Sequence, residues 1–153
     1  MPDDGVTIAV EFKELTIYDI WVAGIRLVSR NLTIVSEDDA SIEGSATYDP
    51  TSNTLTLDNF SYTGADYYLC KIEHEEDSEY YYYYYAIIYS KGDLNIALNG
   101  ENTLDCAITD DDSDYIEKKC IGINVDGALT IGGGTLNATI IKGNAIVANT
   151  LTI

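Results

Sequence analysis

Two stretches of this 153-residue chain concentrate side chains that could do chemistry. One is an acidic cluster made of Asp110, Asp111, Asp112 and Asp114, and the other is an unbroken run of six tyrosines. Clustered carboxylates supply the hard oxygen ligands that calcium requires. Tyrosine combines an apolar ring face with a polar edge, which suits stacking on a sugar ring and hydrogen-bonding its hydroxyls.

The acidic cluster predicts a calcium site, although it does not match an EF-hand. Counted from Asp110, the acids at 112 and 114 fit that loop, but Tyr115 stands at the turn glycine and Ile121 at the bidentate glutamate. A looser site shared with Glu73, Glu75, Glu76 or Asp77 is one form of this hypothesis. The alternative is a solvated acidic loop that keeps β edges from associating.

The tyrosine run predicts a carbohydrate platform. Successive side chains of a strand point to opposite faces, so one set of three rings would pack inward and the other would form an exposed row. The alternative is that the exposed set covers a sheet edge or a subunit contact. The predicted ligand-binding residues are Tyr80, Tyr81, Tyr82, Tyr83, Tyr84 and Tyr85.

No pattern in the sequence specifies a catalytic site. His74 has no nucleophile pattern beside it, and Gly132–Gly134 lacks the following lysine of a phosphate loop. Acids are so abundant that no pair stands out as a glycosidase pair. Lys118 and Lys119 are the nearest candidates for a lyase base beside the acidic cluster. We therefore expect a protein that is not an enzyme.

A repeated strand motif must position these segments. The motif in Leu94–Ile96 returns in Leu129–Ile131 and Leu151–Ile153, and an earlier relative is Leu55–Leu57. Such a unit cannot bury its apolar face alone and must stack on its neighbours. The sequence therefore predicts one all-β domain over residues 1–153, built as a short right-handed parallel β-helix with an N-terminal β-hairpin cap.

The spacing of the repeats locates two insertions. Leu129 and Leu151 are 22 residues apart, whereas Leu94 and Leu129 are 35 apart and Leu55 and Leu94 are 39 apart. The extra residues fall near 65–82 and 108–119, and both insertions are acidic. Insertions at equivalent points of stacked repeats project from one face. Within the stacked coils of residues 46–153, we therefore predict two acidic loops side by side.

Residues 1–45 are predicted to cap the coils. The β-rich runs 15–22 and 25–28, separated by Ala23 and Gly24, predict a hairpin, and residues 49–53 have the composition of a second hairpin loop. At the other end, Ile153 falls inside a strand. We expect either that the protein continues or that this uncapped strand pairs with another copy.

Charge and cysteine content limit the partners and the compartment. The net charge of −18 and the pI of about 4.1 argue against nucleic acid and anionic membranes as partners. No apolar run approaches the roughly 20 residues of a membrane helix, and residues 1–5 do not resemble a signal peptide. Buried free thiols are expected at Cys70, Cys106 and Cys120, and a Cys106–Cys120 disulfide around the acidic cluster is the alternative.

Several turn-and-strand motifs resemble a known kind of surface protein. The stretch Tyr18-Asp-Ile-Trp-Val-Ala-Gly24 and the stretches 48–57, 92–96 and 99–104 resemble a module of surface proteins from gut and environmental Firmicutes. Residues 122–125 and 127–131 look like the β-helical carbohydrate-binding proteins of cellulolytic clostridia. That resemblance implies a secreted, calcium-binding protein that attaches to acidic plant polysaccharide without cleaving it.

These observations lead to three functional hypotheses. The first is a non-catalytic extracellular binding or adhesion module for carbohydrate, assisted by calcium. The second is a structural spacer that displays neighbouring domains of a surface protein. The third is a polysaccharide-active enzyme.

Overall fold

The computed structural model describes residues 11–64, 67–74, 76, 79–106, 108 and 115–153. Every regular element in these residues is a β-strand, which confirms the all-β prediction. Nothing in this part of the chain is a helix of the length and apolarity needed to cross a membrane. The strands are β1 (Ile17–Val22), β2 (Ile25–Val28), β3 (Thr33–Val35), β4 (Ile42–Asp49), β5 (Thr54–Tyr62), β6 (Tyr68–His74), β7 (Tyr81–Ser90), β8 (Leu94–Cys106), β9 (Ile116–Ile140) and β10 (Gly143–Thr152).

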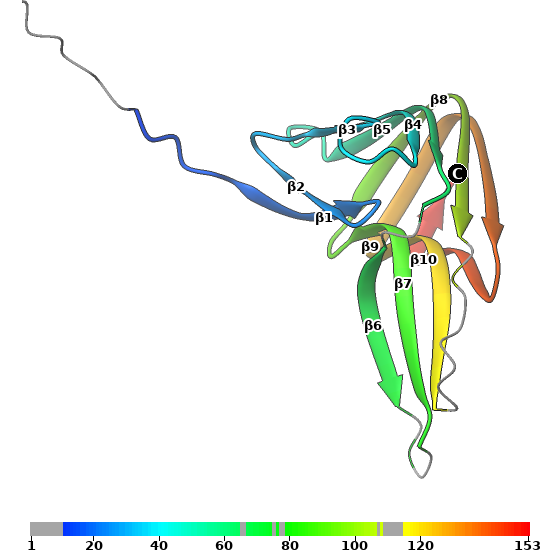
Figure 1. Cartoon of the computed structure of the whole chain (residues 1–153). Helices are drawn as coiled ribbons and strands as arrows, with labels where there is room; N and C mark the ends of the chain where they lie inside the picture. The colour runs from blue at the N-terminus through cyan, green and yellow to red at the C-terminus, as the bar shows by residue number, and fades with distance from the viewer. Residues whose placement is uncertain (1–10, 65–66, 75, 77–78, 107, 109–114) are drawn as a thin grey trace, which may run out of the picture.

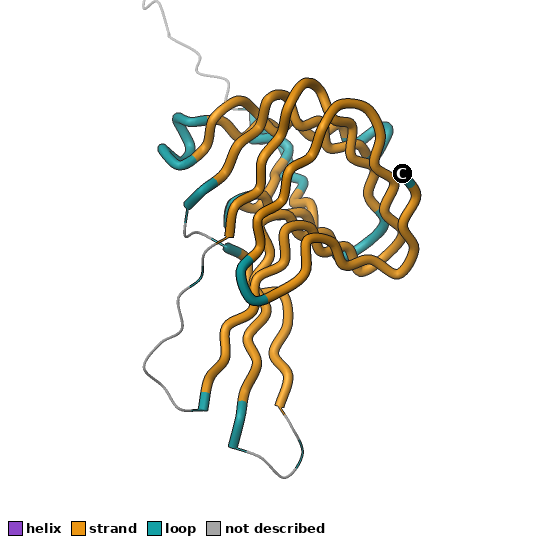
Figure 2. The backbone as a smooth tube through the Cα atoms, turned by 90° about the vertical axis from the view of Figure 1, so that its right-hand side faces the viewer, coloured by secondary structure: helices purple, strands orange, loops and turns teal. Residues whose placement is uncertain are grey.

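The strands form one mixed sheet that curls until it is nearly closed and barrel-like (Figures 1 and 2). The main order is β2-β1-β7-β9-β8-β5-β4-β3, with β10 added to β9 and β6 added to β7. Parallel pairing joins β5 to β8, β8 to β9, β7 to β9 and β9 to β10. Antiparallel strands, β1 with β2 and β4 with β3, flank this parallel part.

The parallel ladders stack the repeated motif on itself. Leu94 pairs with Leu129, and Leu129 pairs with Leu151, as the repeat spacing predicts. The earliest copy is aligned differently, because Leu55 pairs with Ile96 and not with Leu94. A shift of two residues keeps each side chain on the same face of the strand, so the buried alternation does not distinguish the two registers.

The predicted hairpins are both present. Ala23 and Gly24 have φ angles of 49° and 75°, and this left-handed pair closes the tight turn between β1 and β2. Asn53, with a φ of 51°, ends the turn between β4 and β5, and the Asp49 carboxylate accepts a hydrogen bond from the backbone N–H of Thr51 at 2.9 Å. The first hairpin is held on the barrel because β1 pairs with β7.

Aliphatic and aromatic side chains fill the barrel interior, where Leu55, Leu57, Phe60 and Ile123 are fully buried. One buried polar side chain, Asn102, joins three strands. Its Oδ1 accepts the backbone N–H of Phe60 at 2.9 Å, and its Nδ2 donates to the carbonyls of residues 99 and 135, each at 3.2 Å. These bonds satisfy both ends of the amide, as burial of a polar group requires.

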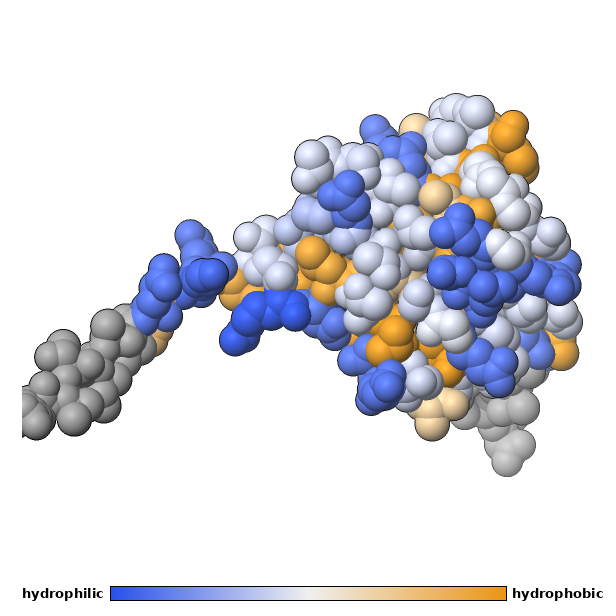
Figure 3. Space-filling model, turned by 90° about the horizontal axis from the view of Figure 1, so that it is seen from above, coloured by the Kyte–Doolittle hydropathy of each residue, from blue (hydrophilic) through white to orange (hydrophobic). Residues whose placement is uncertain are grey.

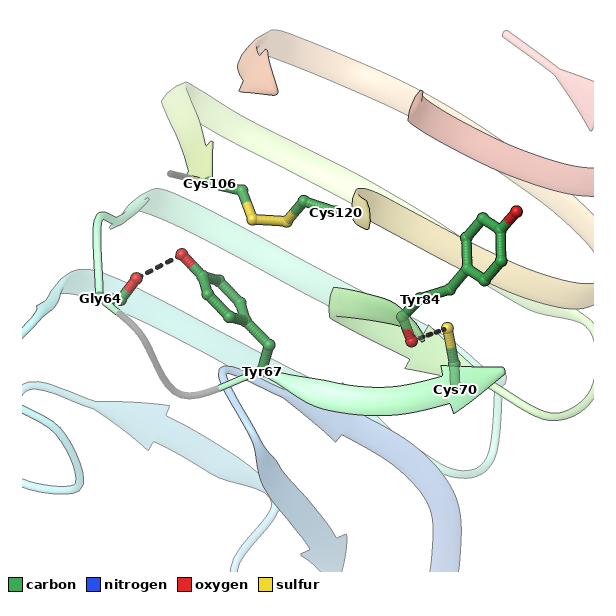
Figure 4. Close-up of a disulfide and its surroundings, with 6 residues drawn as sticks. All are labelled: Gly64, Tyr67, Cys70, Tyr84, Cys106 and Cys120. Carbon is green, nitrogen blue, oxygen red and sulfur yellow. Dashed lines mark hydrogen bonds between the residues drawn. A yellow bond between two sulfur atoms is a disulfide. The ribbon is translucent and has the colours of Figure 1, made fainter. Parts of the chain in front are cut away.

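The expectation of free thiols is wrong for two of the three cysteines. Cys106, at the end of β8, is bonded to Cys120 in β9 (Figure 4). Both cysteines also bond the backbone of the turn between β9 and β10, at Ile141 and Lys142. The N–H of Ile141 donates to the Cys106 carbonyl at 3.2 Å, and the N–H of Cys120 donates to the Lys142 carbonyl at 3.1 Å. Cys70 is the free cysteine.

Three strand segments project beyond the barrel (Figures 1 and 2). We call them the arm, and they are residues 68–74 of β6, 81–86 of β7 and 116–120 of β9. Tyr81 pairs with His74 on one side and with Ile116 on the other. Described residues of the two predicted insertions, Tyr81 of the first and Ile116 of the second, therefore pair with each other near the tip of the arm.

Candidate functional site

The tyrosine run forms the central strand of the arm, so its side chains divide between the two faces of a three-stranded ribbon. Tyr82 pairs with Glu73 and Glu117, and Tyr84 pairs with Lys71 and Lys119. Paired residues in neighbouring strands share a face. One face of the arm therefore combines two phenol rings with both acidic and basic side chains.

A hollow of about 510 Å³ lies on this face and is lined by Glu73, His74, Tyr82, Tyr84 and Lys119. The Lys119 Nζ lies 4.2 Å from the centroid of the Tyr82 ring and 5.8 Å from that of the Tyr84 ring. The Tyr84 hydroxyl donates a hydrogen bond of 2.7 Å to Glu73 Oε2. The hollow thus offers aromatic walls, an ammonium donor and a carboxylate acceptor within one space.

The charge states in the hollow follow from these contacts. Lys71 forms an ion pair with Glu73, and its hydrogen bond, together with the one from Tyr84, holds the pKa of Glu73 below its ordinary value. The hydrogen bond to the same Glu73 carboxylate raises the pKa of Tyr84 to about 12, because only the protonated phenol can donate it; burial and the nearby negative charge add to the effect. At neutral pH the site therefore contains a carboxylate and a protonated phenol.

A packed aromatic cluster lies at the base of the arm. Tyr68 stacks on Trp21 at a centroid distance of 4.2 Å and on Tyr89 at 4.8 Å, and the Arg26 guanidinium lies 4.7 Å from the Trp21 ring. The Tyr89 hydroxyl donates a 2.6 Å hydrogen bond to Asp126. Burial, followed by this bond, raises the pKa of Tyr89. These contacts fix the position of the arm on the barrel.

Cys70 lies between the aromatic cluster and the hollow. Its thiol donates to the Tyr84 carbonyl at 3.2 Å (Figure 4), and burial raises the pKa of the thiol. The raised pKa makes it a poor nucleophile at neutral pH. Cys70 therefore serves to pack β6 against β7.

The structure brings together only part of the predicted tyrosine site. Tyr82 and Tyr84 line the hollow, whereas Tyr83 and Tyr85 pair with Ile72 and Leu69 on the opposite face. At the tip, the Tyr81 ring is tilted against the His74 ring at a centroid distance of 4.5 Å, and the Tyr80 ring lies 6.3 Å from the Tyr115 ring. Because successive rings face opposite sides of the arm, the six tyrosines do not share one surface.

The predicted metal residues Asp110, Asp111, Asp112 and Asp114 lie outside the described residues. In the part of the chain that is described, no group of three His, Cys, Asp or Glu side chains is arranged to hold a metal ion. The calcium hypothesis thus stays a prediction.

Glu73 and Lys119 complete the hollow, and sequence reasoning gave them other roles, as a calcium ligand and as a lyase base. They reach the hollow because β6, which carries Glu73, and β9, which carries Lys119, pair with the two sides of β7. The alternation of Glu73 with Lys71, and of Glu117 with Lys119, was the available signal, because such pairs place opposite charges on one face of a strand.

Comparisons of the chain with protein-family models, with curated proteins and with solved structures found no match.

Proposed function

We propose that the chain is a non-catalytic carbohydrate-binding module and that the hollow on the arm is its binding site. The observation that carries this proposal is the combination of Tyr82, Tyr84, Lys119 and Glu73 around about 510 Å³. That volume falls within the roughly 300–1,000 Å³ typical of small-ligand sites. Phenol rings match the apolar face of a sugar, and the ammonium and carboxylate match its hydroxyls as donor and acceptor.

The chemistry of the hollow favours binding over catalysis. Glycoside hydrolysis normally uses two carboxyl groups, one of them kept protonated by a raised pKa. Among the described residues that line the hollow, Glu73 is the single carboxylate, and its pKa is lowered. The site therefore lacks a matched acid and base.

Two further features belong to the same proposal. The in-register ladder of Leu94, Leu129 and Leu151 supports a short right-handed parallel β-helix as the finer description of the barrel-like sheet. The Cys106–Cys120 disulfide supports an oxidising, extracellular location. Calcium bound by the acidic cluster would assist carbohydrate binding.

A glycan array, run with calcium and with a chelator, tests the proposal and identifies the ligand. The best glycan is then titrated by calorimetry into the unchanged protein and the variant Tyr82→Ala. Loss of the ring is expected to weaken binding about tenfold, equivalent to about 1.4 kcal/mol. If calcium assists, the chelator lowers the affinity of the unchanged protein as well.

Tyr83→Ala is the matched control, because Tyr83 is also half-buried and lies on the opposite face of the same strand. This variant is expected to keep the affinity of the unchanged protein. Failure of every glycan to bind a folded protein overturns the proposal and favours the spacer hypothesis. Equal losses in the two variants would mean that the hollow is not the site.

A further inference from the structure

The rings that line the hollow on the arm already hold ammonium groups of the chain itself. The Lys119 Nζ lies 4.2 Å from the centroid of the Tyr82 ring, and the Lys71 Nζ lies 5.8 Å from that of the Tyr84 ring. An ammonium within about 6 Å of a ring centroid is attracted by the negative face of the ring. The two phenol rings therefore form a cation-binding surface as well as a surface on which a sugar can stack.

The two ammonium groups are held in different ways. Lys71 forms an ion pair with Glu73. Within the described residues, Lys119 has no carboxylate at ion-pair distance, so contact with the rings is what positions its head group. Its flexible four-carbon stem allows the head group to move aside. Lys119 is thus the occupant that a ligand can displace from the Tyr82 ring.

Carboxylates lie beside the rings and can pair with an incoming positive charge. Glu73 lines the hollow, and its lowered pKa keeps it ionised at neutral pH. Glu117 lies on the same face, because it pairs with Tyr82 between β7 and β9. Once the Lys119 head group moves away, these two carboxylates outnumber the remaining ammonium of Lys71. The hollow then combines aromatic faces with an excess of negative charge, which favours an ammonium ligand.

The charge of the whole chain favours the same class of ligand. The 26 acidic residues and 8 basic residues give a net charge of −18. A field of this sign attracts positively charged polymers and repels glycans that carry carboxylate or sulfate groups. The long-range electrostatics of the chain and the local chemistry of the hollow are therefore consistent with each other.

We infer that the hollow selects glycans with free amino groups, such as an oligomer of glucosamine, and that a ligand amine replaces the Lys119 ammonium on the Tyr82 ring. The inference rests on the proposed carbohydrate-binding function and names the class of sugar. The exchange puts one ammonium where another stood, so the aromatic contact is kept. The ligand amine also gains the attraction of Glu73, and the displaced Lys119 remains beside the hollow as a donor for a sugar hydroxyl.

Two oligomers of equal length that differ only in N-acetylation provide the test. The glucosamine oligomer is titrated into the protein by calorimetry at a pH where its amines are protonated, and the neutral N-acetylglucosamine oligomer is titrated under the same conditions. The amine form is expected to bind at least about fivefold more tightly. Added salt should weaken binding of the amine form and leave that of the neutral form unchanged, because salt screens only the charged ligand.

The exchange itself is tested with Lys119→Gln, which removes the resident ammonium and keeps a hydrogen-bond donor. This variant is expected to bind the glucosamine oligomer about threefold more tightly than the unchanged protein, because no chain ammonium competes for the Tyr82 ring. Lys118→Gln is the matched control. It makes the same change in net charge at a position that pairs with Tyr83 on the opposite face of the arm, so it should change the affinity less.

The possible results separate this inference from the proposed function. Equal affinity for the two oligomers, or tighter binding of the N-acetylated one, overturns the inference and leaves carbohydrate binding standing. Amine binding that Tyr82→Ala leaves intact also overturns it, because attraction to the acidic surface would then be sufficient. Equal affinities of Lys119→Gln and Lys118→Gln overturn the exchange. If no glycan binds to a protein that circular dichroism shows to be folded, the inference and the proposed function both fail.

Discussion

Glu73 contacts a base and a phenol at once, and this decides how the hollow responds to pH. Lys71 and Tyr84 both favour its ionised form, while the resulting anion keeps Tyr84 protonated to higher pH. The hydrogen bond thus favours the ionised form of Glu73 and the protonated form of Tyr84. A ligand that enters between them meets a fixed pattern of donors and acceptors, which lowers the ordering cost of binding.

The Tyr84 shift predicts a loss of stability in alkali. The pKa of Tyr84 rises from 10.0 to about 12 in the folded protein, so between these values the unfolded chain releases a proton that the folded chain retains. Unfolding therefore becomes easier as pH rises through this window. Tyr84→Phe is expected to show a smaller fall in melting temperature between pH 10 and about 12 than the unchanged protein.

Glu73→Gln is the companion variant, because it removes the anion and keeps a hydrogen-bond acceptor. Its alkaline fall in melting temperature should also be smaller than that of the unchanged protein, because without the anion the pKa of Tyr84 moves back toward its value in the unfolded chain. Tyrosine absorbance should show this residue titrating at lower pH than in the unchanged protein. If both variants follow the curve of the unchanged protein, the Glu73–Tyr84 bond does not control the titration.

At the scale of elements, the disulfide fixes the strand of the arm that β9 contributes. It joins the end of β8 to Cys120 of β9, and both cysteines are fully buried. A cross-link between residues 14 apart lowers the conformational entropy of the unfolded chain. In the chain-entropy model this raises the free energy of unfolding by about 3 kcal/mol.

Replacing both cysteines tests this contribution. Cys106→Ala/Cys120→Ala is expected to lower the free energy of unfolding by about 3 kcal/mol in denaturant titrations. Cys70→Ala should cost less, because its thiol is free and half-buried. A reducing agent should destabilise the unchanged protein and leave the double variant unaffected; equal sensitivity of the two would contradict the assignment.

The start of β10 packs closely against β9. A Cβ added to Gly143 would overlap the Cys120 backbone carbonyl, whereas one added to Gly92 would meet no atom within 4 Å. Gly143→Ala is therefore expected to destabilise the protein by at least about 1–3 kcal/mol, as overpacking does. Gly92→Ala is the control, and thermal melting of the two variants should separate them clearly.

The local turns and strands could be predicted from the sequence, but the pairing of strands far apart in the chain could not. The turns at Ala23–Gly24 and residues 49–53 are short-range signals, and the Leu94 and Leu129 repeats align by spacing. The disulfide and the hollow depend on long-range pairing. Lys119 reaches the Tyr82 ring only because β9 lies beside β7, and nothing within either strand specifies that neighbour.

At the scale of the whole molecule, the main feature is the large excess of negative charge. Hydrophilic residues are spread over the surface seen from above, with smaller hydrophobic patches between them (Figure 3). The 26 acidic residues far outnumber the 8 basic ones, so carboxylates repel one another across the molecule. Repulsion of this kind destabilises a compact state and weakens as salt screens it.

Salt is accordingly expected to stabilise the protein. Raising ionic strength from about 0.01 M to about 0.15 M shortens the Debye length from about 30 Å to about 8 Å. The melting temperature of the unchanged chain should rise over this range. Sodium chloride and potassium chloride should act alike, since screening depends on charge and not on ion identity; a melting temperature that is flat or falls with salt would contradict this account.

The Cys106–Cys120 bond also bears on how the segment between its cysteines could be redesigned. Residues 116–119 of this segment pair with β7, and Ile108 packs against the barrel core, so a replacement must keep these contacts as well as the disulfide. Grafting a different sequence between residues 108 and 116 should therefore change what the arm presents while the paired strands and the barrel keep their packing.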